Sequence, residues 1–167
     1  MKFFGQLPVE RKEELMKIII CLDNENGMMF HGRRLSQDRL LRKDILKELG
    51  NGKLWMNEYS AKMFADDQNK NIMVSEEFLS QAGNQEFCFV ENVPLFAIEA
   101  QIEQLIIYRW NRSYPSDQKL DLDLEQWKMT GTVEFSGSSH EKITKEIYEK
   151  QIRGEMMSVS VEVPGGY

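Results

Sequence analysis

Lys17-Ile18-Ile19-Ile20-Cys21-Leu22-Asp23 is a nearly continuous apolar run close to the start of the chain. Its three consecutive isoleucines favour an extended backbone, because β-branched side chains pack well on a pleated surface. An apolar run of this length predicts a buried strand. Polar residues follow at once, since positions 23–27 read Asp-Asn-Glu-Asn-Gly and predict a turn.

Outward from this strand, extended and helical patterns alternate along the chain. Further strands are predicted at 28–30, 53–57, 71–74, 86–91, 104–111 and 127–135. A helix is predicted from Ser36, as N-cap, to Gly50, and shorter helices at 60–64, 76–82 and 95–103. Ser138 and Glu141 have the spacing of a capping box, which predicts that the longest helix runs from there to about Arg153.

The alternation predicts an α/β fold: a single layered domain with a mixed β-sheet of about five to six strands flanked by helices. The length of 167 residues suits one domain. We expect residues 1–15 to form an N-terminal leader or arm and 16–154 the ligand-binding domain. Residues 155–167 are expected to be a C-terminal tail, with a strand at 158–163.

Composition narrows the classes of partner. The net charge of −6 argues against binding a nucleic-acid duplex, which requires a broad basic face. No apolar run reaches the ~20 residues of a membrane span, and the N-terminus lacks a signal-peptide pattern. We therefore expect no membrane association and a cytoplasmic protein, with Cys21 and Cys88 as buried thiols.

A basic segment at 32–43 stands out in this acidic chain, because it carries five cations and only one acid. It precedes a predicted helix, where free backbone N–H groups and the helix dipole favour an anion. The pattern predicts a phosphate site formed by Arg33, Arg34, Ser36, Gln37 and Arg39. The alternative is a solvated helix face whose arginines point to water or pair with acids elsewhere in the chain.

A second candidate site lies at the ends of three predicted strands, where α/β sheets bind ligands. Arginines grip phosphates, aromatic rings stack on bases and asparagines contact polar edges. We expect this pocket to include Arg109, Asn111, Arg112, Tyr114, Phe89, Asn92, Met56 and Asn57. In particular, Asn57, Asn92 and Asn111 would line one sheet edge. The alternative is a strand whose aromatic residues face the core and whose arginines face water.

The sequence lacks the motifs of metal sites, nucleotide-binding loops and serine hydrolases. Two histidines 109 positions apart and the lack of Cys-x-x-Cys predict no metal site. The chain also lacks a Walker loop, Gly-x-Gly-x-x-Gly and Gly-x-Ser-x-Gly. We expect no catalytic residues and no cofactor.

Six motifs together resemble those of the small Firmicute and prophage proteins that act as Thoeris anti-defence sponges. They are Cys-Leu-Asp-x-x-x-Gly-Met at 21–28, Gly-Arg-Arg-x-Ser-Gln-Asp-Arg at 32–39, Leu-Trp-Met-Asn-x-Tyr-Ser-Ala-Lys at 54–62, Phe-Val-Glu-Asn at 89–92, Tyr-Arg-Trp-Asn-Arg-x-Tyr-Pro at 108–115 and Gly-Ser-Ser-His-Glu at 137–141. The resemblance spans about residues 16–150.

This resemblance implies non-catalytic sequestration of cyclic ADP-ribose signals made by TIR enzymes, which inhibits bacterial anti-phage defence. It also implies a dimer or hexamer, a location in the host cytoplasm for a phage-encoded protein, and a second site for the cyclic oligonucleotides of CBASS immunity. The basic segment would suit that second ligand. An apolar, charge-poor tail at 156–163 independently favours a homo-oligomer.

A weaker resemblance is to dihydrofolate reductase. It rests on the strand followed by Asp23 and Gly27, and on the later run of Tyr114-Pro115-x-Asp117, Trp127-Lys128 and Glu134-Phe135. The Leu-Pro-Trp loop and the Gly-Gly cofactor turn of that family are missing. The alternatives to sequestration are therefore a divergent nucleotide-dependent enzyme of this type, a phosphodiesterase acting on the same ligands, and a scaffold that binds another protein.

Overall fold

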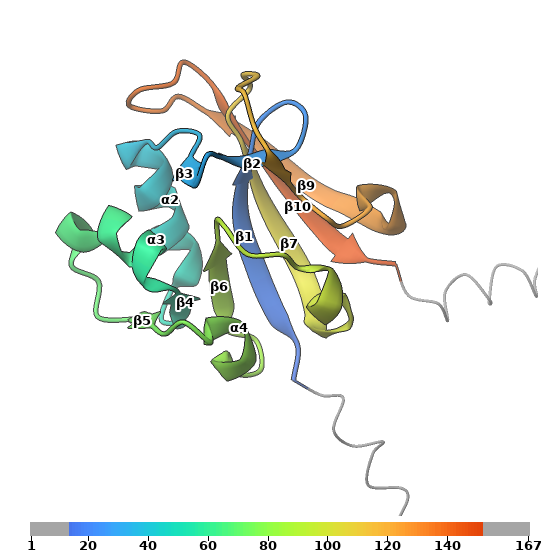
Figure 1. Cartoon of the computed structure of the whole chain (residues 1–167). Helices are drawn as coiled ribbons and strands as arrows, with labels where there is room; N and C mark the ends of the chain where they lie inside the picture. The colour runs from blue at the N-terminus through green and yellow to red at the C-terminus, as the bar shows by residue number, and fades with distance from the viewer. Residues whose placement is uncertain (1–13, 152–167) are drawn as a thin grey trace, which may run out of the picture.

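A computed structural model describes residues 14–151 of the chain (Figure 1). Its main element is a seven-stranded mixed sheet with the order β5-β4-β6-β1-β7-β10-β9. The first five strands in this order are parallel to one another, and β10 and β9 run antiparallel at one edge. The bounds are β1 Met16–Leu22, β4 Leu54–Met56, β5 Ile72–Val74, β6 Phe87–Val90, β7 Ile102–Arg109, β9 Trp127–Phe135 and β10 Ile143–Lys150. The α/β class and the mixed sheet are confirmed.

A small antiparallel sheet crosses the carboxyl end of β1. It has the order β3-β2-β8, with β2 at Gly27–Phe30, β3 at Arg33–Arg34 and β8 at Gln118–Lys119. Strands β2 and β3 are joined by a two-residue turn in which His31 and Gly32 both have positive φ, +53° and +74°. Such a turn needs a residue like glycine and matches the twist of the paired strands. The basic segment therefore begins in a hairpin.

Helices and 3-10 turns cover both faces of the main sheet. Their bounds are α2 Arg39–Leu49, α3 Glu58–Met63, η2 Ala65–Asp67, α4 Phe78–Gln81, η3 Phe96–Gln101 and η4 Leu124–Gln126. Helix α2 buries Leu41, Ile45 and Leu49 against one face, whereas Phe78 of α4 packs in the cluster on the other. The apolar spacing in the sequence produces both contacts.

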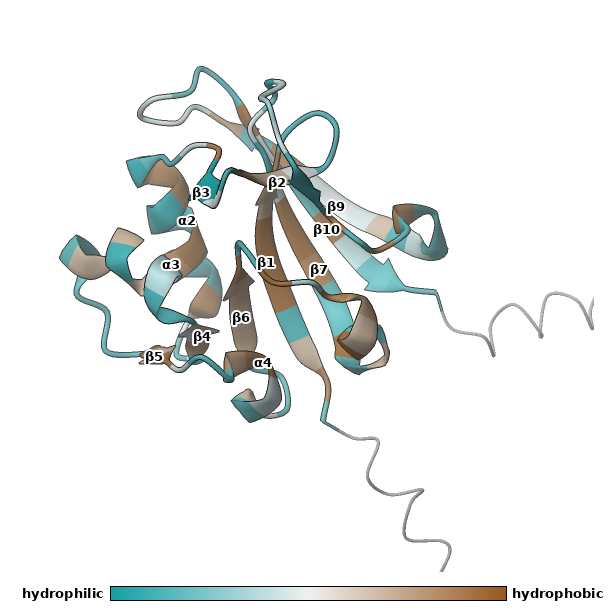
Figure 2. Cartoon of the chain, viewed as in Figure 1, coloured by the Kyte–Doolittle hydropathy of each residue, from teal (hydrophilic) through white to brown (hydrophobic). Residues whose placement is uncertain are grey.

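Strand β1 lies at the centre of both clusters, as its sequence predicts. Ile18, Ile20 and Leu22 belong to one cluster and Ile19 to the other, because successive side chains point to opposite faces. All four are completely buried. Figure 2 shows that the central strands β1, β6 and β7 are the most apolar part of the sheet.

The predicted helix from Ser138 onward is wrong. Residues 143–150 form β10, which inserts between β7 and β9 and pairs antiparallel with both. Pairing on both sides overrides a moderate helical preference, since strand preference depends on neighbouring strands. This strand also raises the count in the main sheet to seven.

Other boundaries also differ from prediction. The cap of α2 is Asp38 and not Ser36, because the Asp38 carboxylate accepts from the N–H groups of Leu40 and Leu41. The predicted helix at 95–103 is only the 3-10 segment η3, and β7 begins directly after it, at Ile102. The predicted strand at 158–163, the tail and most of the predicted leader lie outside the described residues.

Within residues 14–151 the longest helix, α2, has 11 residues, and none there has the length and apolarity of a membrane span.

Candidate functional site

The carboxyl ends of the parallel strands bring together several of the predicted polar residues. Asn57 follows β4 and Asn92 lies just after β6, and the Asn57 amide donates to Asn92 Oδ1 at 2.9 Å. Asn111 lies elsewhere, since its amide donates to the Lys142 carbonyl and to Thr144 Oγ1. The structure thus joins two of the three asparagines expected at one edge.

Glu91, the residue before Asn92, forms an ion pair with Arg34. Arg34 Nε and Nη2 donate to the two Glu91 carboxylate oxygens at 2.8 and 2.9 Å, and Ser60 Oγ donates to Oε1 at 2.7 Å. The guanidinium also lies over the Tyr59 ring, 4.4 Å from its centre. The hydrogen bond that Arg34 donates to Glu91 raises the pKa of Arg34. For Arg34, therefore, pairing with an acid elsewhere in the chain is the correct alternative.

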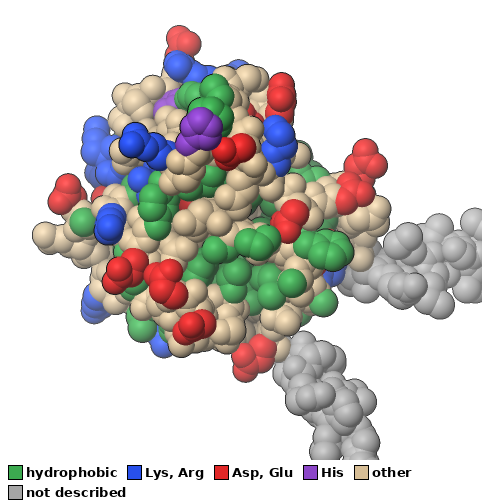
Figure 3. Space-filling view, viewed as in Figure 1, with side chains coloured by type: hydrophobic (Ala, Val, Ile, Leu, Met, Phe, Trp, Pro, Cys, Tyr) green, Lys and Arg blue, Asp and Glu red, His purple; other side chains and the backbone are tan. Residues whose placement is uncertain are grey.

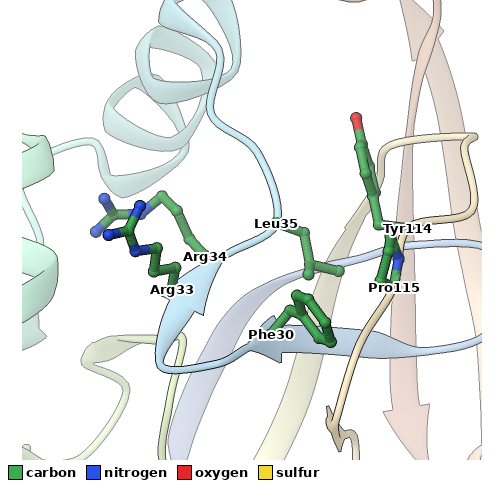
Figure 4. A pocket seen from close by; sticks show the side chains of 6 residues that line it. All are labelled: Phe30, Arg33, Arg34, Leu35, Tyr114 and Pro115. Atoms are coloured by element: carbon green, nitrogen blue, oxygen red, sulfur yellow. The ribbon is translucent and has the colours of Figure 1, made fainter.

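A hollow of about 200 Å³ has Arg34 of this ion pair in its wall. It is lined by Phe30, Arg33, Arg34, Leu35, Tyr114 and Pro115. Figure 4 shows the two guanidinium groups on one side, Tyr114 and Pro115 on the other, and Phe30 and Leu35 between them. The Arg33 side chain is exposed and pairs with no acid within the described part of the chain. Figure 3 shows that Lys and Arg side chains gather over this α2–β3 part of the surface.

Tyr114 is held at the hollow by the turn that follows β1. The buried Asp23 carboxylate accepts from the backbone N–H of Gly27 at 2.7 Å and from that of Tyr114 at 2.9 Å. Burial alone would raise the pKa of Asp23, but these hydrogen bonds outweigh it and lower that pKa. Gly27 is required here, because a Cβ would lie 2.6 Å from Ser116 Oγ.

Behind the hollow, Asp38 anchors the loop between β9 and β10. Its carboxylate accepts from the backbone N–H groups of Ser138 and Ser139 and lies 3.2 Å from His140 Nδ1. Burial would raise the pKa of Asp38, but the bonds from Ser138, Ser139 and His140 hold it well below its ordinary value. Asp38 is therefore an anion at neutral pH and fixes the position of His140.

Other residues of the predicted pockets have different surroundings. Phe89 and Met56 are completely buried, and Phe89 packs edge-on against Phe64 5.3 Å away, so the predicted stacking of a base on Phe89 is wrong. Gln37 and Arg39 are exposed at the start of α2, and Arg112 is exposed beyond β7. Of the strand-end set, Tyr114 lines the hollow.

Arg109 is part of the scaffold. Its Nε donates to Glu146 Oε1 at 3.0 Å and its Nη1 to Asn26 Oδ1 at 2.6 Å, which ties β7 to β10 and to the turn after β1. We expect Arg109→Ala to lower the free energy of unfolding by about 2–4 kcal/mol, since the partly buried Glu146 carboxylate loses its cation and keeps the Tyr148 hydroxyl as donor. Urea denaturation measures this loss, with the exposed Arg112→Ala as control. Equal stability of the two variants would contradict the assignment.

Sequence reasoning missed Glu91, Asp38 and His140 as parts of the site, and Phe30, Leu35 and Pro115 as its walls. Glu91 and Pro115 lie within the motifs quoted above, and Asp38 is the one acid in the basic segment. Their contacts join residues 57 to 102 positions apart, which no local pattern reveals.

No family model matches the sequence, and no curated protein matches it. A solved structure of dihydrofolate reductase from Enterococcus faecalis, complexed with NADP(H) and RAB-propyl, is similar in fold. The TM-score is 0.60 at 13% identity, and the match covers 83% of this chain and 97% of that chain. The fold is dihydrofolate-reductase-like. At this identity the likeness concerns the architecture alone.

The strand ends here do not fit the pyrophosphate of a dinucleotide such as NADP(H). Such a group needs unpaired N–H groups at a helix N-terminus beside the strand ends. At α3 the Ser60 N–H donates to Asn57 Oδ1 and the Glu58 N–H to the Glu76 carboxylate. The Glu76 carboxylate at the start of α3 would repel a pyrophosphate there.

Proposed function

We propose that the chain binds a small cyclic nucleotide in the hollow and withholds it chemically unchanged. The observation that carries this proposal is the exposed Arg33, which pairs with no acid in the described part of the chain and lines one hollow together with the aromatic residues Phe30 and Tyr114. Aromatic faces stack on bases and a guanidinium fork suits a phosphate. The volume admits a base with part of its sugar phosphate, so the rest of the ligand would lie outside.

The geometry also supports one site in place of two. Arg33 comes from the basic segment and Tyr114 from the strand-end set, and both line the same hollow. The anion site proposed for the whole basic segment is reduced to Arg33, because Arg34 is paired with Glu91 and Arg39 lies outside the lining.

Binding without conversion of the nucleotide is supported by the state of the nearby acids. Asp38 and Glu91 both accept several hydrogen bonds from their own chain, so neither is free to take a proton from a water molecule that would attack a phosphodiester. Cyclic ADP-ribose isomers and cyclic oligonucleotides are the ligands to test, because of the resemblance to the anti-defence sponges. In that role the protein would inhibit anti-phage defence by lowering the free signal, as a dimer or hexamer in the cytoplasm.

We expect Arg33→Ala to weaken the binding of a cyclic nucleotide about 10- to 150-fold, the equivalent of one charge-assisted hydrogen bond at ~1.5–3 kcal/mol. A thermal-shift screen of the full chain against cyclic ADP-ribose isomers and cyclic di- and trinucleotides measures it. At ~100-fold excess over Kd the parent gains about 2.7 kcal/mol.

Arg39→Ala is the matched control, since it removes an exposed arginine of the same segment that lies outside the hollow. It should leave binding unchanged. If Arg39→Ala weakens trinucleotide binding as much as Arg33→Ala does, the basic segment is a separate site and the single-site proposal is wrong.

A further inference from the structure

Ser36, His140 and Asp38 form a chain of polar contacts beside the hollow. Ser36 Oγ lies 3.0 Å from His140 Nε2, and His140 Nδ1 lies 3.2 Å from Asp38 Oδ2. Asp38 and His140 are buried, whereas Ser36 is half-buried and follows Leu35, which lines the hollow. The ring of Trp110 packs against the imidazole with their centres 4.5 Å apart, which fixes its plane.

The hydrogen bonds define which imidazole nitrogen carries the proton. The Asp38 carboxylate can only accept, so Nδ1 donates to it and Nε2 is left as an acceptor in the neutral ring. Ser139 Oγ, 3.1 Å from Nδ1, is placed to donate its own proton to Asp38 Oδ2 or to the Gln37 carbonyl. Ser36 is therefore oriented to donate its hydroxyl proton to Nε2.

We propose that Ser36 is an activated nucleophile toward carboxylic esters, with His140 as its general base and Asp38 as the residue that positions His140. A hydroxyl bonded to an imidazole that is oriented by a carboxylate is the arrangement that nucleophilic serines use on unrelated folds. This arrangement is recognised by its geometry and not by residue spacing, so no sequence motif predicts it.

The hollow next to Ser36 defines the substrate class. Ser36 is not itself a lining residue, but its hydroxyl and that of the lining residue Tyr114 both contact His140 Nε2. Phe30, Leu35 and Pro115 give the hollow apolar walls, which favour an uncharged ester with a short apolar acyl group. Within residues 14–151 the backbone N–H groups of Ser36 and Gln37 donate to no other protein group. They are available to the oxygen that becomes negative during attack, as in an oxyanion hole.

The reaction balances with water as the only co-reactant. As Ser36 Oγ bonds to the acyl carbon, its proton moves to His140 Nε2 and the carbonyl π electrons move onto oxygen. Collapse of this intermediate breaks the bond to the alcohol, which leaves with the proton from His140. Water then attacks acyl-Ser36 with His140 again as base, and releases the acid.

Tyr114 is the competitor for His140. Its hydroxyl lies 3.3 Å from Nε2, farther than that of Ser36, and can share the same lone pair.

The probe is diisopropyl fluorophosphate, applied to the full chain and located by peptide mass spectrometry. We expect one adduct, on Ser36, formed at least 100-fold faster than on the exposed Ser80, as general-base assistance contributes ~10²–10⁴-fold. Ser36→Ala should lose the adduct, and Ser80→Ala should keep it. Hydrolysis of p-nitrophenyl butyrate should fall at least 100-fold in Ser36→Ala.

Absence of an adduct on Ser36, or an unchanged adduct in Ser36→Ala, would overturn the proposal. Labelling without ester turnover would overturn the hydrolytic step, and an adduct on Tyr114 in place of Ser36 would overturn Ser36 as the nucleophile. This inference does not depend on nucleotide binding, because labelling and ester hydrolysis are measured without any nucleotide. A labelled protein that binds no nucleotide refutes only the proposed function.

Discussion

Replacing Asp38 by alanine is expected to lower the free energy of unfolding by at least ~4 kcal/mol, out of the 5–15 kcal/mol typical of a domain. The change leaves the N–H groups of Leu40, Leu41, Ser138 and Ser139 without their acceptor. The hydrogen bond from Leu41 is buried and the other three are partly buried, and a donor left unpaired costs about 1–3 kcal/mol. Urea denaturation followed by circular dichroism measures this loss.

The control for this change is Asp66→Ala, because Asp66 is an exposed acid in η2. It should alter the free energy of unfolding by no more than ~0.5 kcal/mol. If Asp38→Ala is as stable as Asp66→Ala, Asp38 does not anchor the β9–β10 loop.

The Asp38 carboxylate also makes the free energy of unfolding depend on pH in the acidic range. The pKa of Asp38 is lower in the folded chain than the ~3.9 of an unfolded aspartate. Its contribution is therefore complete above about pH 4 and is lost as the pH falls toward the folded pKa. A shallower decline below pH 4 in Asp38→Ala than in the parent would support this origin.

Breaking the ion pair between Arg34 and Glu91 is the second large effect. The Glu91 side chain is 8% exposed, so Arg34→Ala leaves a buried carboxylate with Ser60 as its remaining side-chain donor. The expected loss is about 3–5 kcal/mol. The double change Arg34→Met with Glu91→Leu should recover most of it, because a buried pair and well-packed apolar side chains of similar volume are nearly equivalent.

The chain offers a matched exposed pair as control. Lys142 and Glu134 are 3.8 Å apart and more than half exposed, so Glu134→Gln should cost less than ~1 kcal/mol. A double variant no more stable than Arg34→Ala would show that the loss reflects packing around Arg34 and not an unpaired charge.

The central strand was predictable because its signal is local. Three consecutive isoleucines favour a buried strand for β1, and Asp23 and Gly27 predict the turn that follows it. Strand β10 was not predictable in this way, because Ile143–Lys150 has a mixed pattern and gains its conformation from β7 and β9. The error at Ser138 has the same cause, since Ser138 caps no helix and donates to Asp38, a hundred positions away.

The candidate site was likewise predictable only where the signal is local. The sequence indicated that arginines, aromatic rings and asparagines gather near strand ends, and Arg33 and Tyr114 do line one hollow. It could not indicate which arginines are free, because that depends on acids distant in the chain. Arg34 forms an ion pair with Glu91, and Arg109 forms one with Glu146. Glu91 directly follows β6 and Glu146 lies in β10, so neither acid is near its arginine in the sequence.

The central claim is that this chain holds a cyclic nucleotide without converting it. The most direct measurement is a calorimetric titration of the full chain with a cyclic ADP-ribose isomer, followed by heat denaturation and mass analysis of the released ligand. We expect saturable binding that is weakened in Arg33→Ala and unchanged in Arg39→Ala, with the ligand recovered intact. Recovery of a cleaved or reduced product, or no binding of any isomer or cyclic oligonucleotide, would contradict it.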